Sequence, residues 1–230
     1  PCWNSAKARG VTGSSNPVGD PFDIDYVAHE MGHQFGANHT YNGTNGSCGG
    51  NIGAATAYEP GSGVTIMAYA GICSIENLAR NSIAAFHIGS LNEMEAYITN
   101  VASGYGGSCP VVTATGNSIP TVDAGKDYTI PQQTPFELTA AASDANGDAL
   151  TYSWEQFDTG TATSTASTPD LGNNPLFRSY LPMTSATRSF PSATYILDNA
   201  NVPPDTYNCS GSTCVVGEKL PSTNRTMKFQ

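Results

Sequence analysis

The chain has 230 residues, enough for one large domain or two ordinary ones, and carries 9 basic and 19 acidic side chains. Its formal charge of −10 excludes a general nucleic-acid binder, which needs a basic surface against phosphate, and argues against docking on anionic lipid. No apolar run approaches the roughly 18 residues of a membrane-spanning helix, so we expect no membrane span.

The cysteines indicate an oxidising, extracellular compartment, because their number is even and lysine is scarce. Six cysteines allow fifteen pairings, and free buried thiols are the alternative. The favoured pairing is Cys48–Cys73, Cys209–Cys214 and Cys2–Cys109. The chain opens without a starting Met or an apolar leader, so we interpret it as a mature or trimmed segment.

The first predicted element is a helix over residues 21–35. Asp20 suits the N-cap and Pro21 the first helical position, while Gly36 can end the helix. Apolar residues follow at helical spacing, at Ile24, Val27, Met31 and Phe35.

Three of the four histidines fall within eleven residues, in the pattern H-E-x-x-H-x-x-G-x-x-H. His29 and His33 would project from one face of the helix, and Gly36 would let the chain turn back and bring His39 to them. Three imidazoles suit one Zn²⁺ and leave a fourth position open, which is typical of catalytic zinc. Glu30 would activate a zinc-bound water and pass its proton to a leaving amine. The alternatives are a purely structural zinc site and three ordinary histidines.

The motif resembles that of the metzincin zinc endopeptidases, whose second mark is a methionine turn below the metal. Thr65-Ile66-Met67-Ala68-Tyr69 matches that turn. The resemblance implies that Met67 forms the hydrophobic surface beneath the three imidazoles of the metal site. It also makes Tyr69 a second catalytic candidate, with simple packing as the equal alternative.

The flanking residues, 24–28 and 58–63, are similar to bacterial secreted reprolysin-like proteases. Thr40 after the third histidine is neither the Asp of adamalysins nor the Glu of astacins, so it assigns no subfamily. Metzincins carry a sheet before the active-site helix, but only 28 residues precede His29. We therefore expect that this sheet is missing, that the fragment alone could be inactive, and that the remainder of the polypeptide could be a partner.

A second helix is predicted from the capping box at Ser90 and Glu93 to a stop at Gly104. Its buried stripe would consist of Leu91, Met94, Ile98 and Val101. His87, just before it, is interpreted as a packed histidine.

After residue 105 the hydrophobic pattern changes to period two, at Phe136 to Ala142 and at Leu150 to Trp154. Residues 119–230 resemble PKD-like or immunoglobulin-like modules, with Trp154 in the core. The predicted fold class is therefore α+β: a metzincin-type catalytic domain at 1–110 and an all-β Ig-like sandwich at 119–230. The sandwich would be incomplete at its C-terminus and carry a long irregular insertion around 159–217.

Two further groups of polar residues are interpreted without a catalytic role. Asp144, Asn146 and Asp148 have the spacing of calcium ligands, but the glutamate of an EF-hand loop is missing, so a turn without metal is favoured. Glu59, Asp23 and Asp25 are interpreted as loop and helix-start charges.

The sequence thus predicts a secreted bacterial zinc metalloendopeptidase that acts on protein or peptide substrates. His29, His33 and His39 would bind one zinc ion, and Glu30 would act as the base. The rival hypothesis is an extracellular binding or adhesion protein that retains an inactive zinc site, and a third is a zinc amidase or other hydrolase.

Overall fold

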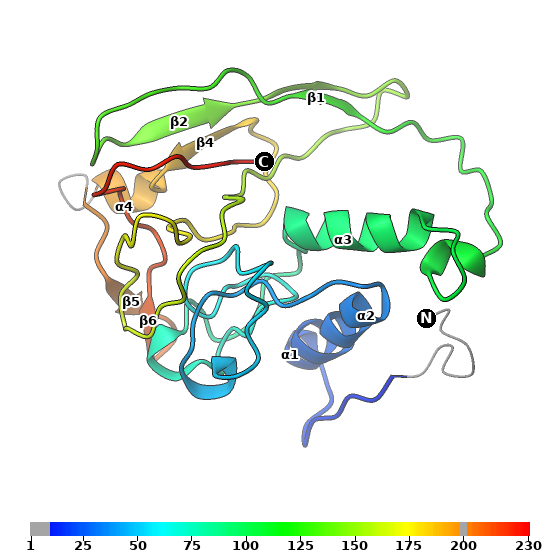
Figure 1. Ribbon diagram of the computed structural model, residues 1–230, viewed down its shortest axis with the longest axis horizontal. Coiled ribbons are helices and arrows are strands. Elements are labelled where there is room, and N and C mark those ends of the chain that lie inside the picture. Colours follow the sequence, from blue (N-terminus) through cyan, green and yellow to red (C-terminus); the bar gives the residue numbers. More distant parts are fainter. Residues whose placement is uncertain (1–9, 198–201) are drawn as a thin grey trace.

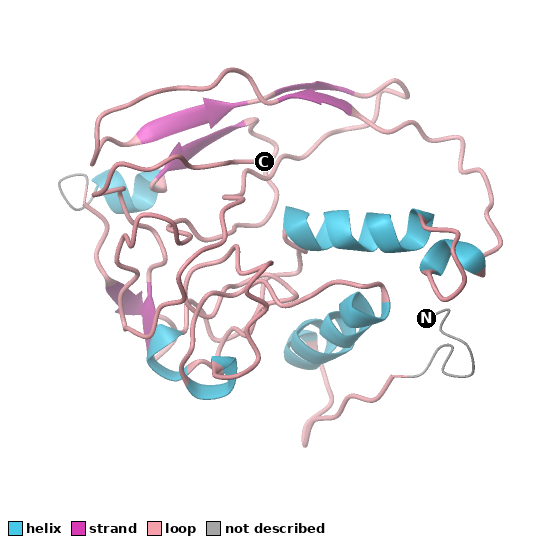
Figure 2. Cartoon of the chain, viewed as in Figure 1, coloured by secondary structure: helices cyan, strands magenta, loops and turns pink. Residues whose placement is uncertain are grey.

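The computed structural model describes residues 10–197 and 202–230. Helices and strands occupy a small part of the chain, and loops fill the centre of the molecule (Figures 1 and 2). The helices are α1 (Asp20–Phe22), α2 (His29–Gln34), α3 (Ile88–Thr99) and α4 (Ala193–Leu197). The strands are β1 (Thr121–Asp123), β2 (Phe136–Thr139), β3 (Ala141–Ser143), β4 (Thr187–Phe190), β5 (Thr206–Asn208) and β6 (Thr213–Val215).

The predicted first helix exists, but its start and its middle differ from the prediction. Gly19, not Asp20, is the N-cap, and its carbonyl accepts from the N–H groups of Phe22 and Asp23. Between α1 and α2 the chain forms a π-helical segment, Asp23–Ala28, a conformation that is frequent next to functional sites. Along this helix Met31 and Phe35 are exposed, whereas Ile24 packs against the core.

α3 begins earlier and turns a different face inward than the capping box predicted. His87 is its N-cap, and the ring of His87 accepts from Gly89 N–H at 3.0 Å. The predicted stripe is wrong for its members Leu91, Ile98 and Val101, which are exposed. Met94, the fourth member, does pack against the core, as predicted, and Ser90 one turn earlier is buried with it.

The part after residue 119 contains three antiparallel two-stranded sheets, β1–β3, β2–β4 and β5–β6, and no clear Ig-like sandwich within the described residues. The predicted alternation does hold in β2, where Phe136 and Leu138 face the core. The segment around Tyr152 forms only an isolated bridge to Met183. Ten of the chain's fifteen prolines follow residue 119, and a proline has no backbone N–H to donate to a ladder.

This C-terminal part nevertheless has a well-defined core. Trp154 is buried in it, as predicted, with Leu176, Phe177 and Phe190. The Trp154 indole N–H donates to the Ala186 carbonyl at 3.0 Å, which satisfies its only polar atom.

The two parts of the chain share their buried surfaces. Val215 of β6 packs with Val64 and Leu78 from the N-terminal part in one apolar cluster. The Glu155 carboxylate accepts from Ile88 N–H at the start of α3, where a negative charge is favourable. The division into domains at 1–110 and 119–230 stays a prediction, as does the insertion at 159–217.

Leu78→Ala should lower the free energy of unfolding by about 2–5 kcal/mol, because Leu78 is fully buried between the two parts. Urea unfolding measures this loss, and the midpoints followed by circular dichroism and by tryptophan fluorescence should fall together. Ile75→Ala is the matched control, since Ile75 lies on the same segment and is 53% exposed; a Leu78→Ala loss no larger than that of Ile75→Ala would contradict a shared core.

Candidate metal centre

α2 and the turn after it bring three histidine rings together. His29 and His33 lie one helical turn apart, with ring centroids separated by 4.8 Å. Gly36 takes a positive φ of 94° and ends the helix, as predicted. The N–H groups of Ala37 and Gly36 donate to the carbonyls of Gly32 and His33, which is the Schellman pattern of a helix C-terminus. The chain then returns and places His39 against the other two rings.

Each ring is held by a hydrogen bond from Nδ1 to a backbone carbonyl. The acceptors are Ile66 O for His29 (2.7 Å), Ala37 O for His33 (2.8 Å) and Asn51 O for His39 (2.6 Å). A carbonyl only accepts, so the proton of each neutral ring belongs on Nδ1. Each Nε2 therefore keeps a free electron pair.

The ring nitrogens fit a metal ion. One ligand atom from each histidine lies within 4.8 Å of the others, and Nε2 of His33 is 3.1 Å from Nε2 of His39. Two nitrogens that both lack a proton cannot form a hydrogen bond, so a cation between them would relieve their repulsion. Tetrahedral zinc with bonds of about 2.0–2.1 Å separates its nitrogen ligands by about 3.3 Å, close to the observed spacing.

Burial favours the neutral form of two of the rings, those of His29 and His39. It lowers the pKa of His29 to about 4, although the bond to Ile66 acts in the opposite direction. Burial also lowers the pKa of His39, partly opposed by the bond to Asn51. Neutral imidazole is the form that binds metals, so the site is prepared for an ion near neutral pH.

Met67 lies in a tight turn directly beneath the helix. The N–H of Ala68 donates to Thr65 O, which closes the turn, and the Met67 side chain is fully buried. A Cβ on Gly32 would come within 2.3 Å of the Met67 sulfur. A glycine at this variable position of the motif is therefore needed for the close approach, a role that sequence reasoning missed.

Tyr69 lies beside the histidine rings, and the charge of Glu30 acts on both Tyr69 and His39. The Tyr69 ring centroid is 4.6 Å from that of His39. Burial raises the pKa of Tyr69, and the negative charge of Glu30 raises it further. That charge also raises the pKa of His39, against the larger effect of burial. The catalytic roles of Glu30 and Tyr69, and the metal-floor role of Met67, stay predictions at this point.

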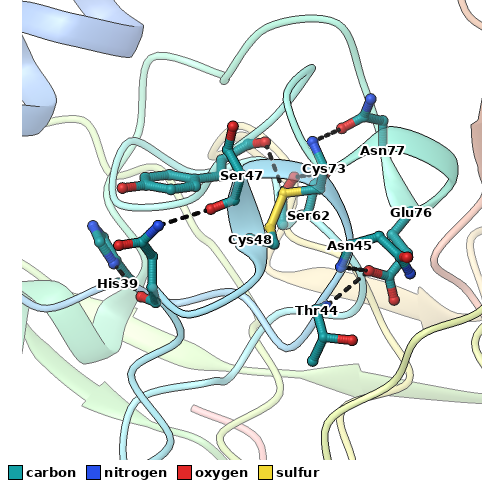
Figure 3. The surroundings of a disulfide bond; sticks show 12 residues. His39, Thr44, Asn45, Ser47, Cys48, Ser62, Cys73, Glu76 and Asn77 are labelled. Carbon is teal, nitrogen blue, oxygen red and sulfur yellow. Dashed lines mark hydrogen bonds between the residues drawn. A yellow bond between two sulfur atoms is a disulfide. The ribbon is translucent and has the colours of Figure 1, made fainter.

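The loop that carries Asn51 is fastened by a disulfide (Figure 3). Cys48 and Cys73 form this bond, as predicted, and Ser47 N–H donates to Ile72 O beside it. The disulfide thus joins the loop that holds His39 to the segment after Tyr69. Cys209–Cys214 is also confirmed, whereas the predicted Cys2–Cys109 pair lies outside the described residues because Cys2 is not among them.

The other singled-out residues lie away from the ligands or serve the fold. His87 is packed, as predicted: it is buried and stacks on Tyr58 with ring centroids 5.1 Å apart. Asp144 accepts from the N–H groups of Asn146 and Asp148, which supports a turn there.

Asp25 and Glu59 are bound more tightly than the sequence predicted. Asp25 accepts from Asn81 and Ser82, which ties the helix to a loop. Glu59 is not a simple loop charge, because it is buried and accepts four hydrogen bonds.

Comparison with known proteins agrees with this geometry. Residues 2–96 match the family described as metallo-peptidase family M12B, reprolysin-like. This part of the chain is therefore similar to reprolysin-like metallopeptidases. The match includes all three histidines, Glu30 and Met67, and it ends within α3. Neither the curated proteins nor the solved structures contained a match to the chain.

The metal-free chain should lose stability as the pH falls from about 6.5 to about 4. His29 has a folded pKa of about 4 against an ordinary value of 6.5, so the unfolded chain binds the extra proton in this window. Urea unfolding of chelator-treated protein at several pH values measures the slope. In His29→Gln the unfolding free energy should change less steeply with pH over the same window. An equal pH dependence would contradict the effect of burial on His29.

Proposed function

We propose that the chain is a zinc-dependent endopeptidase that hydrolyses peptide bonds in protein substrates. The observation that carries this proposal is the set of three hydrogen bonds from histidine Nδ1 atoms to backbone carbonyls. They leave three Nε2 atoms free and convergent, as a metal site requires.

The Nε2 atoms of His29, His33 and His39 would hold the ion. When bound, zinc would polarise the peptide carbonyl and make a nearby water more acidic. Three protein ligands leave room for substrate, which distinguishes a catalytic from a structural site.

Glu30 acts as the general base in this proposal. Its carboxylate takes a proton from the attacking water as the oxygen–carbon bond forms, and it delivers that proton to the nitrogen as the carbon–nitrogen bond breaks. Tyr69, beside His39 and within the field of Glu30, would donate a hydrogen bond to the oxygen that gains negative charge.

We further propose that the protein works outside a bacterial cell, without nucleic acid as a partner. The disulfides Cys48–Cys73 and Cys209–Cys214 support an oxidising compartment. No helix among the described residues is both long and apolar enough to cross a membrane. The acidic composition supports the absence of a nucleic-acid partner.

Glu30→Gln should lower the turnover of an unfolded protein substrate about 10²- to 10⁴-fold and leave one zinc bound per chain. The reason is that the amide introduced in place of the carboxylate cannot accept the proton, whereas the three ligands are unchanged. Zinc content by atomic absorption and cleavage by gel electrophoresis measure the two effects. Glu95→Gln is the matched control, since Glu95 is an exposed carboxylate on α3.

The other outcomes discriminate between the functions. Zinc without cleavage in the wild-type chain would favour the binding or adhesion protein with an inactive site. Cleavage of small amides that does not depend on peptide length would favour an amidase. Loss of zinc in Glu30→Gln would contradict the role given to Glu30.

A further inference from the structure

Glu59 forms a carboxylate clamp between two segments of the metal centre. Its side chain is 1% exposed, so all its hydrogen bonds are made inside the protein. Oε1 accepts from the hydroxyls of Thr40 (2.7 Å) and Thr65, while Oε2 accepts from the N–H groups of Val64 (2.7 Å) and Thr65 (3.1 Å). One carboxylate therefore joins residue 40 to residues 64 and 65.

Both ends of this clamp are adjacent to metal-site groups. Thr40 directly follows the third histidine, and Thr65 directly precedes Ile66, whose carbonyl holds His29. The backbone repeats the connection, because Thr40 N–H donates to Met67 O (3.2 Å) and Glu59 N–H donates to Thr40 O (2.8 Å). The position of His39 relative to His29 thus depends on this carboxylate.

We propose that Glu59 is a positioning residue for the metal centre, acting through Thr40 on His39 and through Thr65 on His29. This inference rests on the proposed zinc site. Groups that orient metal ligands from behind typically change metal affinity by about 10- to 100-fold when they are lost. Glu59 touches neither ligand, so its effect is to fix the spacing of the two Nε2 atoms.

A second buried carboxylate provides an internal control. Glu76 is also fully buried and accepts from the N–H groups of Thr44 (2.8 Å) and Asn45 (2.6 Å), as Figure 3 shows. The Thr163 hydroxyl donates to its other oxygen at 3.5 Å. This second clamp ends at residues 44 and 45, five or more residues from His39, so it should serve the fold and leave the ligands unaffected.

Thr40→Val tests the inference with little change in shape. Valine removes one hydroxyl, while Thr65 and Val64 still satisfy the carboxylate. We expect the dissociation constant for zinc, measured on the full chain by competition with a chromophoric chelator, to rise about 10- to 100-fold. Thr163→Val removes the corresponding hydroxyl at Glu76 and should change the zinc dissociation constant less than about threefold. Thr40→Ser keeps the hydroxyl at position 40 and should give the wild-type dissociation constant.

The unfolding free energy of the metal-free chains separates positioning from stability. If Thr40→Val and Thr163→Val lower stability alike and both leave zinc affinity unchanged, the inference is overturned and Glu59 serves only the fold. Should Thr40→Val fail to fold, Thr65→Val breaks the other arm of the clamp, and the same rise in the zinc dissociation constant is expected. A wild-type chain that binds no zinc would instead overturn the proposed function itself.

Discussion

The hydrogen bond from a histidine Nδ1 to a backbone carbonyl is the interaction on which the N-terminal half of this protein depends. It fixes the tautomer, the ring orientation and the availability of Nε2 at once. The three acceptors come from different segments: the turn after α2, the loop closed by Cys48–Cys73, and the methionine turn. A loop-rich chain can support a rigid site because each of these segments is itself anchored.

The C-terminal part of the molecule packs against the N-terminal part away from the ligands. Thr163 pairs with the segment after the third histidine, since its N–H donates to Asn42 O and Thr44 donates to its carbonyl. Phe157 stacks on Tyr58, with centroids 4.5 Å apart, and Tyr58 stacks on His87 in turn. Residues after 150 therefore pack directly against the reprolysin-like region and add to its buried surface.

The local elements of the site could be predicted from the sequence because they follow from short-range rules. The histidine spacing, the glycine at position 36 and the methionine turn each involve fewer than a dozen consecutive residues. The disulfide Cys48–Cys73 could also be inferred, since those cysteines enclose the turn. Glu59 and Gly32 could not, because their roles arise from contacts across the fold: a carboxylate in a Gly-rich loop and a glycine in a variable motif position give no sequence signal.

The difference between short-range rules and long-range contacts also explains the two wrong predictions about the fold, the buried face of α3 and the sandwich after residue 119. Apolar spacing in α3 predicted a stripe through Leu91 and Ile98, but both side chains are exposed. Tyr97 packs closely on Gly36 instead, since a Cβ at Gly36 would lie only 3.1 Å from the Tyr97 Cβ. Alternation in β2 identified its inward face, whereas its partner strand β4 carries Arg188, which is buried in a 3.0 Å ion pair with Glu218. A periodic pattern shows that a residue has a preferred side. Which side the molecule then buries depends on partners that lie dozens of residues away, as they do for Tyr97 and Arg188.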